Sequence, residues 1–171
     1  ASILDVQKTF QVYSSNLNNK DPSDSLLEFG LTYSGIVLGS GEWSIVYKAK
    51  DDQLNDFAVK KINYNDLKLV QRRKRILREI TILKAIAKIS NSSNYFVSLK
   101  NAFTDKSGNM FIVTDFIEGF ELCDLLKKFP CGVPELYAKK ILYSLFVGID
   151  LLHQKDIAHR DIKLENILFD K

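Results

Sequence analysis

The segment from His159 to Asn166 concentrates side chains that could carry chemistry. It reads His-Arg-Asp-Ile-Lys-Leu-Glu-Asn, and a short apolar run follows it. Asp161 can accept a proton from a hydroxyl group, Lys163 can neutralise a phosphate in transfer, and Asn166 can offer an amide oxygen to Mg²⁺. A loop that holds two acids, two cations and an amide has few structural reasons to exist, so we interpret it as a catalytic loop.

A lysine and a glutamate further upstream form a second candidate group. Strand alternation places Lys60 on the same face as Ala58, where a cation needs a partner or an anion. Glu79 falls on the apolar stripe of a predicted helix, where an unpaired carboxylate is costly. We predict that the two pair. The alternatives are a surface lysine that extends to water and a glutamate paired with Arg75 or Arg78.

A glycine-rich segment lies between two predicted strands. Gly39, Ser40 and Gly41 precede Val46 by a few residues. Glycines let the backbone turn sharply and bring its N–H groups close to a phosphate. The segment does not open a helix, which argues against a dinucleotide-binding loop. A simple hairpin turn is the alternative interpretation.

The elements that must position these residues follow from the periodicity of the sequence. Short β-branched and aromatic runs predict strands, and apolar residues at spacings of three and four predict helices. The Ser-, Asn- and Asp-rich residues 14–25 predict a linker or turn, while residues 3–13 fit a strand or a short helix equally well. We expect strands within 33–62, 95–103, 110–117 and 167–169, and helices at 66–89, 121–129 and 134–154. This order predicts an α+β arrangement.

Composition narrows the class of protein. The chain has 171 residues, a net charge of +3, 46% hydrophobic and 26% charged residues, which excludes collagen-like, low-complexity and wholly disordered classes. Two cysteines make no disulfide framework, and no Cys/His spacing resembles a zinc site, so we expect an intracellular protein, cytoplasmic or nuclear. The longest apolar stretch, 141–149, is too short to span a membrane, and no membrane partner is expected.

Basic residues cluster between positions 68 and 88. This stretch has eight lysines and arginines and one glutamate, a charge of +7, so the rest of the chain sums to −4. Such a helix could bind nucleic acid or act as a nuclear import signal. A solvated helix face is the favoured interpretation, and nucleic acid is not an expected partner.

In chain order, these motifs resemble those of eukaryotic protein kinases over residues 33–171. The Gly39–Val46 segment is similar to the glycine-rich loop over the ATP phosphates, with Ser44 in place of the third glycine. Residues 57–60 resemble the V-A-I-K strand, and Glu79 matches the ion-pair partner of Lys60 on the αC helix. Residues 159–166 are similar to the catalytic loop.

The resemblance implies a fold and a domain organisation. The fold would be an α+β protein-kinase-like one. A small lobe with a twisted antiparallel sheet and the αC helix would precede the first helices and catalytic loop of the large lobe. Residues 1–30 would be an N-terminal extension or linker, and 31–171 a partial kinase domain. Within it we expect the small lobe at about 31–114, the hinge at about 115–120 and the start of the large lobe at 121–171.

The resemblance also implies ATP and Mg²⁺ as cofactors. Asp161 and Lys163 would be catalytic, and Asn166 would bind the metal. Thr114 would be the gatekeeper of the hinge that contacts adenine, and Glu121 would lie near the ribose. The ATP-binding set would be Gly39, Ser40, Gly41, Val46, Ala58, Lys60, Glu79, Thr114, Asp115, Ile117, Glu121 and Leu168.

The implied activity is transfer of the ATP γ-phosphate to protein serine or threonine. Lys163, two residues after Asp161, resembles the serine/threonine kinases, and the subgroup most resembled is the calcium/calmodulin-dependent kinases. Glu121 and Glu165 match acidic positions that in related kinases receive a basic residue upstream of the target. We therefore hypothesise that substrates carry Arg on that side of the phosphosite.

One part of the family pattern is missing from the sequence. No Asp-Phe-Gly occurs in it, and in the family this aspartate holds Mg²⁺. We therefore expect a piece of a longer serine/threonine kinase that is inactive alone, with an unpacked apolar face on the 134–154 helix. The alternatives are an inactive kinase-like module that binds nucleotide or a partner, and a nucleic-acid-binding protein that uses its basic helix.

Overall fold

The computed structural model describes residues 22–41, 43–63 and 70–170, which form two compact units. The sheet unit holds the described residues up to Thr81 together with Leu99–Phe116. The helical unit holds Ile82–Ser98 and the described residues from Ile117 onward. The expectations for residues 3–13 and for a helix start near 66 lie outside the described residues.

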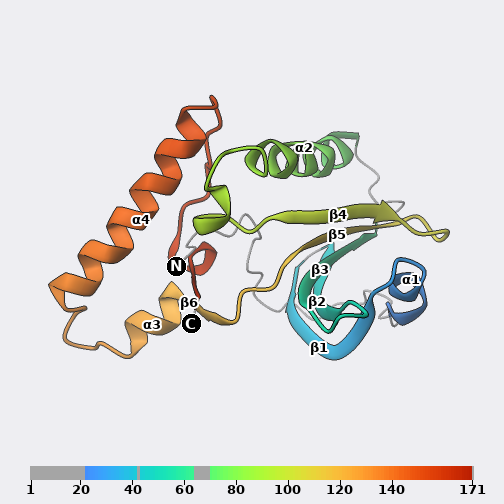
Figure 1. The fold of residues 1–171 in the computed structure, drawn as a ribbon, viewed down its shortest axis with the longest axis horizontal. Coiled ribbons are helices and arrows are strands. Elements are labelled where there is room, and N and C mark those ends of the chain that lie inside the picture. The colour runs from blue at the N-terminus through green and yellow to red at the C-terminus, as the bar shows by residue number, and fades with distance from the viewer. Residues whose placement is uncertain (1–21, 42, 64–69, 171) are drawn as a thin grey trace. The chain divides into compact units, whose positions relative to one another are not determined.

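Five antiparallel strands build the sheet unit (Figure 1). Their order is β1-β2-β3-β5-β4, so β2, β3 and β5 lie inside the sheet and β1 and β4 lie at its edges. β-branched and aromatic residues dominate them, as expected for half-buried strands. The strands are β1 (Thr32–Ser40), β2 (Ser44–Lys50), β3 (Asp56–Asn63), β4 (Leu99–Thr104) and β5 (Asn109–Asp115). The antiparallel sheet and the described helices of the chain confirm the predicted α+β architecture.

Strand register determines which side chains share a face of the sheet. Lys60 on β3 lies opposite Val46 on β2 and Ile112 on β5, while Ala58 lies opposite Thr114. Directly opposed residues project to the same side of a sheet. One face of the three inner strands therefore presents all five side chains together.

The opposite face of the sheet is covered by residues that precede β1. The short helix α1 (Ser23–Leu27) places Leu26 in a buried cluster that includes Val59 and Val113. Removing apolar side chains of this size from water stabilises the fold by roughly 2 kcal/mol each. The buried members of this cluster are Leu26, Leu31, Ala49, Val59, Phe111 and Val113.

Helix α2 (Val70–Ile86) has one buried side and one basic side. Ile80, Leu83 and Ile86 are buried at spacings of three residues. Lys74 and Arg78 are exposed, as are the neighbouring Arg73 and Arg75. The solvent-facing position of these cations fits the interpretation of the basic stretch as a hydrated helix face.

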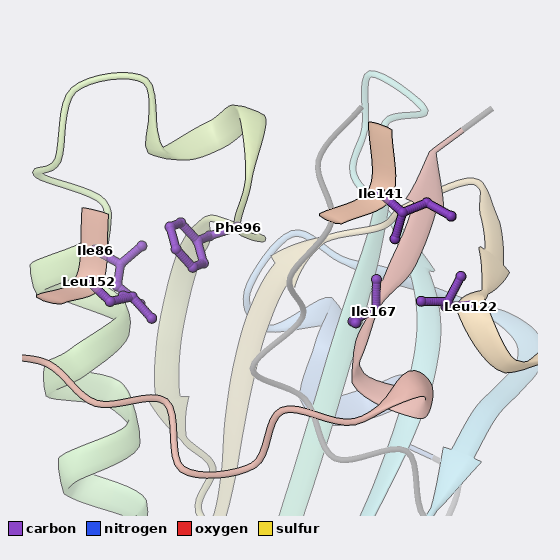
Figure 2. Packing of buried hydrophobic residues seen from close by; sticks show 6 residues of the cluster. All are labelled: Ile86, Phe96, Leu122, Ile141, Leu152 and Ile167. Carbon is purple, nitrogen blue, oxygen red and sulfur yellow. The ribbon is translucent and has the colours of Figure 1, made fainter. Parts of the chain in front are cut away.

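The described part of the helical unit combines helical segments with a two-stranded sheet. Strand β6 (Gly119–Glu121) pairs with β7 (Leu168–Asp170). The unit's helices are α3 (Leu122–Lys127), α4 (Glu135–His153) and two 3-10 turns, η1 (Ser92–Asn94) and η2 (Leu164–Asn166). Figure 2 shows its core: Ile86, Phe96 and Leu152 lie together, as do Leu122, Ile141 and Ile167.

Helix α4 is buried on one side only. Ile141, Gly148 and Leu152 are buried, but Leu136, Tyr143 and Phe146 remain 62–69% exposed. Tyr143 and Phe146 lie one turn apart on the exposed side of the helix, and the exposed Lys139 and Lys140 separate them from Leu136. Among the described helices, none combines the length and apolar character needed to cross a membrane.

The structure differs from the expected elements at one strand start and in one added strand. The strand predicted from residue 95 begins at Leu99 instead. Tyr95 belongs to the turn that ends η1, and Phe96 packs into the core of the helical unit. Asn91, which precedes η1, adopts a left-handed φ of 60°. Strand β6 was not expected, since its three residues carry no periodic signal.

The pairing of β6 with β7 depends on a close approach at Gly119. A Cβ atom built at this position would fall on the carbonyl oxygen of Phe169 and lie 2.6 Å from its carbonyl carbon. Leu122 N, at the start of α3, donates to Ile167 O at 2.8 Å, which continues the pairing. This approach fixes the chain segment after β5 to the segment after the 159–166 loop.

Candidate active site

Lys60 and Glu79 form a largely buried ion pair. Nζ of Lys60 lies 2.7 Å from Oε1 of Glu79, and the two side chains are 9% and 22% exposed. β3 supplies the lysine and α2 supplies the glutamate, both within the sheet unit. The pair proposed from strand alternation and the apolar stripe is therefore present, and it holds an oriented ammonium group on one face of the sheet.

The neighbours of Lys60 on that face are small or apolar. Val46, Ala58 and Thr114 are buried, and the Thr114 hydroxyl donates to the carbonyl oxygen of Ala58 at 3.5 Å. A cation among apolar neighbours interacts strongly with an anion, because little water screens it. The structure thus brings four of the predicted ATP-binding residues together on one face of the sheet: Lys60, Val46, Ala58 and Thr114.

The glycine-rich segment closes the β1–β2 hairpin. Gly39 lies opposite Val46, and Gly41 N donates to Ser44 O at 2.7 Å. The φ angle of Gly39 is not in the left-handed region, and a Cβ there would meet no described atom within 4 Å. Neither backbone conformation nor packing among the described residues requires glycine at 39, so the open space is suited to a ligand that approaches the backbone.

Asp161 and Asn166 are locked together in the 159–166 loop. Nδ2 of Asn166 donates to the backbone oxygen of Asp161 at 2.8 Å and to its carboxylate Oδ2 at 3.1 Å. The η2 turn positions the amide, because Asn166 N donates to Lys163 O at 3.0 Å. Asp161 is half-buried and Lys163 is exposed. The carboxylate is therefore fixed in orientation, while the lysine extends toward water.

The backbone before Asp161 is strained. Arg160 has a φ of 62°, a left-handed conformation that non-glycine residues rarely adopt. Nδ1 of His159 accepts the N–H of Asp161 at 3.3 Å. Burial lowers the pKa of His159, and the nearby charge of Asp161 raises it, with burial the stronger effect. Strain of this kind is a feature of functional sites, where surrounding contacts hold the backbone in place.

Glu121 and Leu168 are neighbours across the β6–β7 pair. They are direct partners in the strand register, so two predicted ATP-binding residues of the helical unit share one face. Ile117 lies just upstream, where its carbonyl accepts Gly119 N at 3.0 Å. Glu121 Oε2 also accepts the thiol of Cys123 at 3.1 Å.

The donor set around Asn166 fits a magnesium ion. Asn166 is 2% exposed, and its Oδ1 is buried without a hydrogen-bond partner among the described residues. The carboxylate of Asp161 is adjacent, and Mg²⁺ prefers oxygen donors. An unpaired buried amide oxygen is costly, and a bound cation would satisfy it. The residues present therefore fit the metal expected at Asn166.

A second cluster of donor groups has different chemistry. Glu121, Cys123 and Asp124 have ligand atoms within 4.8 Å of one another. Burial raises the pKa of the Cys123 thiol to about 11, and the hydrogen bond to Glu121 adds to that effect. The thiol donates to Glu121, the residue that precedes the first turn of α3, so this contact is part of the local structure at the start of that helix.

One contact near the predicted hinge was missed from the sequence. Nζ of Lys48 lies 4.1 Å from the ring centroid of Phe116 and 2.8 Å from Oδ2 of Asp56. Lys48 follows Val46 by two residues on β2, so strand alternation alone could have placed it on the same face. The adjacent Asp115 pairs with Lys100 at 2.8 Å. These contacts anchor the end of β5.

Comparisons with known proteins agree with this geometry. Residues 34–171 match the protein kinase domain family. The chain is 31% identical over 133 residues to cyclin-dependent kinase-like 5 of Mus musculus, 27% over 158 residues to serine/threonine-protein kinase RIM15 of Saccharomyces cerevisiae, and 30% over 152 residues to calcium-dependent protein kinase 4 of Plasmodium berghei.

These alignments cover 77%, 92% and 86% of the chain but 13%, 8% and 27% of the relatives. The chain thus spans well under a third of each relative's length. The relatives bear the names of several kinase groups, so the calcium/calmodulin-dependent subgroup stays a prediction. The family match covers most of the chain, from the strand before the glycine-rich segment to its last residue. The chain belongs to the protein kinase family.

Proposed function

We propose that the full-length protein transfers the γ-phosphoryl group of MgATP to serine or threonine hydroxyls of proteins. The observation that carries the proposal is the Asp161 carboxylate, held in place by Asn166 and followed two residues later by Lys163. This arrangement can orient a hydroxyl group, receive its proton and neutralise charge on a phosphate. Family membership supports the same chemistry.

The roles of the residues follow from their chemistry. Lys60 holds phosphate oxygens, and Glu79 keeps its ammonium pointed at them. Asp161 aligns the acceptor hydroxyl and takes its proton as the new oxygen–phosphorus bond forms and the bond to ADP breaks. Lys163 neutralises the transferred group, and Asn166 offers Oδ1 to Mg²⁺. The metal, when bound, neutralises phosphate charge. Catalysis is thus positioning and electrostatics.

Substrate preference is a finer part of the proposal. Glu165 is exposed, and Glu121 is half-buried with one oxygen engaged by Cys123. The two carboxylates would favour a basic residue upstream of the phosphosite. Peptide-library phosphorylation with the full-length protein tests this, and a profile indifferent to Arg on that side would refute it.

The cell compartment is a further part of the proposal. The two free cysteines fit a reducing compartment, cytoplasmic or nuclear.

The test of the activity is an Asp161→Asn variant of the full-length protein. We expect phosphotransfer to fall on the order of a thousandfold or more, because the general base is lost, while nucleotide binding is retained. Asp156→Asn is the matched control: it makes the same change at an exposed position in the preceding turn and should keep activity. Wild-type turnover by Asp161→Asn would contradict the assignment.

A further inference from the structure

Helix α1 and the turn after it are fastened to the turn between β4 and β5. Ser25 Oγ donates to Oδ2 of Asp105 at 2.9 Å, and Lys106 Nζ lies 2.6 Å from Oε1 of Glu28. The ring of Phe29 stacks on that of Phe103, with centroids 3.6 Å apart. All these residues belong to the sheet unit. Three different kinds of contact therefore attach one short segment to the end of β4 and the turn that follows it.

The segment depends on these contacts for its structure. α1 has five residues, and an isolated helix of this length is not stable in water. Leu26 is fully buried beside Val59 and Val113, which are the strand neighbours of Lys60 and Thr114. Undocking α1 would therefore uncover the back of the strands that carry the lysine. The segment is a strap that is ordered only while it is docked.

A negative charge added at Ser25 would turn the attractive Ser25–Asp105 hydrogen bond into a repulsion. Oδ1 and Oδ2 of Asp105 also accept the backbone and side-chain N–H groups of Asn109 at 2.8 and 2.9 Å, so the carboxylate cannot turn away without opening the turn. Ser25 is half-buried and supplies only one hydroxyl proton to this site. An anion in place of that hydroxyl would lose the hydrogen bond and face a fixed carboxylate.

We propose that Ser25 is a phosphorylation site whose modification releases α1 from the β4–β5 turn. A protein kinase would transfer the terminal phosphoryl group of ATP: the bond from Oγ to phosphorus forms, the bond to ADP breaks, and the hydroxyl proton passes to the kinase's base. Asp24 precedes Ser25 and Glu28 follows three residues later. These carboxylates fit a kinase that recognises acidic sequences. Access requires only local opening of this five-residue helix.

Lys106 is a nearby cation of the described residues that could oppose this release. Its ammonium is already paired with Glu28, and its side chain is 87% exposed. Water and salt screen an exposed cation effectively, whereas Asp105 is half-buried and held by its turn. The repulsion from Asp105 therefore exceeds the attraction to Lys106. If the phosphate instead paired with Lys106, it would hold α1 more firmly against the β4–β5 turn. Slower hydrogen exchange in α1 would reveal that opposite result.

The first test is hydrogen exchange on the full-length protein with phosphoserine incorporated genetically at position 25. The amides of Leu26, Phe29 and Leu31 are protected by hydrogen bonds within the strap. We expect phosphoserine to speed their exchange about tenfold, whereas Ser25→Ala, which lacks the added charge, should speed it less. Exchange that is unchanged, or slowed as Lys106 would predict, would overturn the proposal.

A charge-rescue variant separates repulsion from general damage to the strap. Asp105→Asn keeps an oxygen for the Asn109 amide but removes the negative charge, so phosphoserine 25 should release α1 less in that background. An equal release in both backgrounds would refute the role of Asp105. Mass spectrometry of the protein from its own cells, lysed with phosphatase inhibitors, should find phosphate on Ser25. Recovery of that peptide only in unmodified form would overturn the site.

Discussion

Nζ of Lys60 and Oε1 of Glu79 lie 2.7 Å apart, although 19 residues separate them in the chain. The lysine side chain is 9% exposed and the glutamate 22%. Because the cation lies deeper than the anion, the two partners are not equivalent. Loss of Glu79 leaves a buried ammonium unpaired, whereas loss of Lys60 leaves a carboxylate that can still reach water.

This asymmetry predicts the result of a double-mutant cycle. Glu79→Gln should lower the free energy of unfolding by roughly 2–3 kcal/mol, and Lys60→Met should lower it by less. The reason is that only Glu79→Gln leaves a buried charge without its partner. The double variant should be more stable than the sum of the two losses predicts. Denaturant unfolding monitored by fluorescence measures all four proteins. Additive losses would show that the two side chains do not interact in solution.

The metal site proposed at Asn166 predicts a change in magnesium dependence. Asn166→Ala removes the buried Oδ1 and the two hydrogen bonds to Asp161, so the full-length protein should need on the order of tenfold more Mg²⁺ for half-maximal activity. Magnesium titration of phosphotransfer measures the shift. Asn101→Ala, on exposed β4, is the control and should leave the titration unchanged. The same magnesium requirement in Asn166→Ala would remove this residue from the metal site.

His159 predicts a pH dependence of stability. Burial holds its pKa below the ordinary value of 6.5, with the Asp161 charge acting in the other direction. Between the lowered pKa and 6.5, the unfolded chain binds more protons at this residue than the folded one does. The free energy of unfolding should therefore fall as the pH drops through 6.5 toward the lowered value, and the loss ends below it.

Proton NMR titration of the His159 ring gives the pKa directly. Asp161→Asn removes the charge that raises this pKa, so the variant should titrate at a still lower pH than the wild type. His159→Asn should flatten the pH profile of stability over the same interval. A His159 ring that titrates at or above its ordinary value in the folded protein would refute the prediction.

The two cysteines should differ in reactivity. Burial and the hydrogen bond to Glu121 raise the pKa of Cys123 to about 11, while Cys131 is exposed. Alkylation requires the thiolate, so at about pH 8 iodoacetamide should modify Cys131 well before Cys123. Glu121→Gln should speed the reaction of Cys123 and leave that of Cys131 unchanged. Peptide mass spectrometry over time measures both rates, and equal rates in the wild type would contradict the expected pKa.

The features that sequence could predict are those with local signals. The strand around Lys60, the helix that carries Glu79 and the long helix α4 all have clear periodicity, and the structure contains each of them. The pairing of Lys60 with Glu79 was inferable because each residue alone would be a buried, unpaired charge. The 159–166 loop was recognisable because its residue types have few structural uses.

The features that were missed depend on contacts between distant residues. The linker or turn predicted for residues 14–25 overlaps the start of α1 at Ser23, and this short helix forms because Leu26 is buried against the back of the sheet. Phe96 lies in a strand-like run but packs into the helical unit, which overrides its local preference. The left-handed φ angle of Arg160 could not be predicted from its residue type. Such features follow from tertiary packing, which periodicity does not encode.

The approach of β6 to β7 at Gly119 has a genetic consequence. Every codon change that replaces this glycine adds a Cβ atom where the Phe169 carbonyl already lies. Even Gly119→Ala would therefore require the backbone to shift. The neighbouring Phe120 stacks on Phe169 and Glu121 pairs with Leu168, so damage at this position separates two predicted ATP-binding residues. In a saturation-mutagenesis map of this gene, codon 119 should therefore be intolerant of every missense allele, although glycine carries no reactive group.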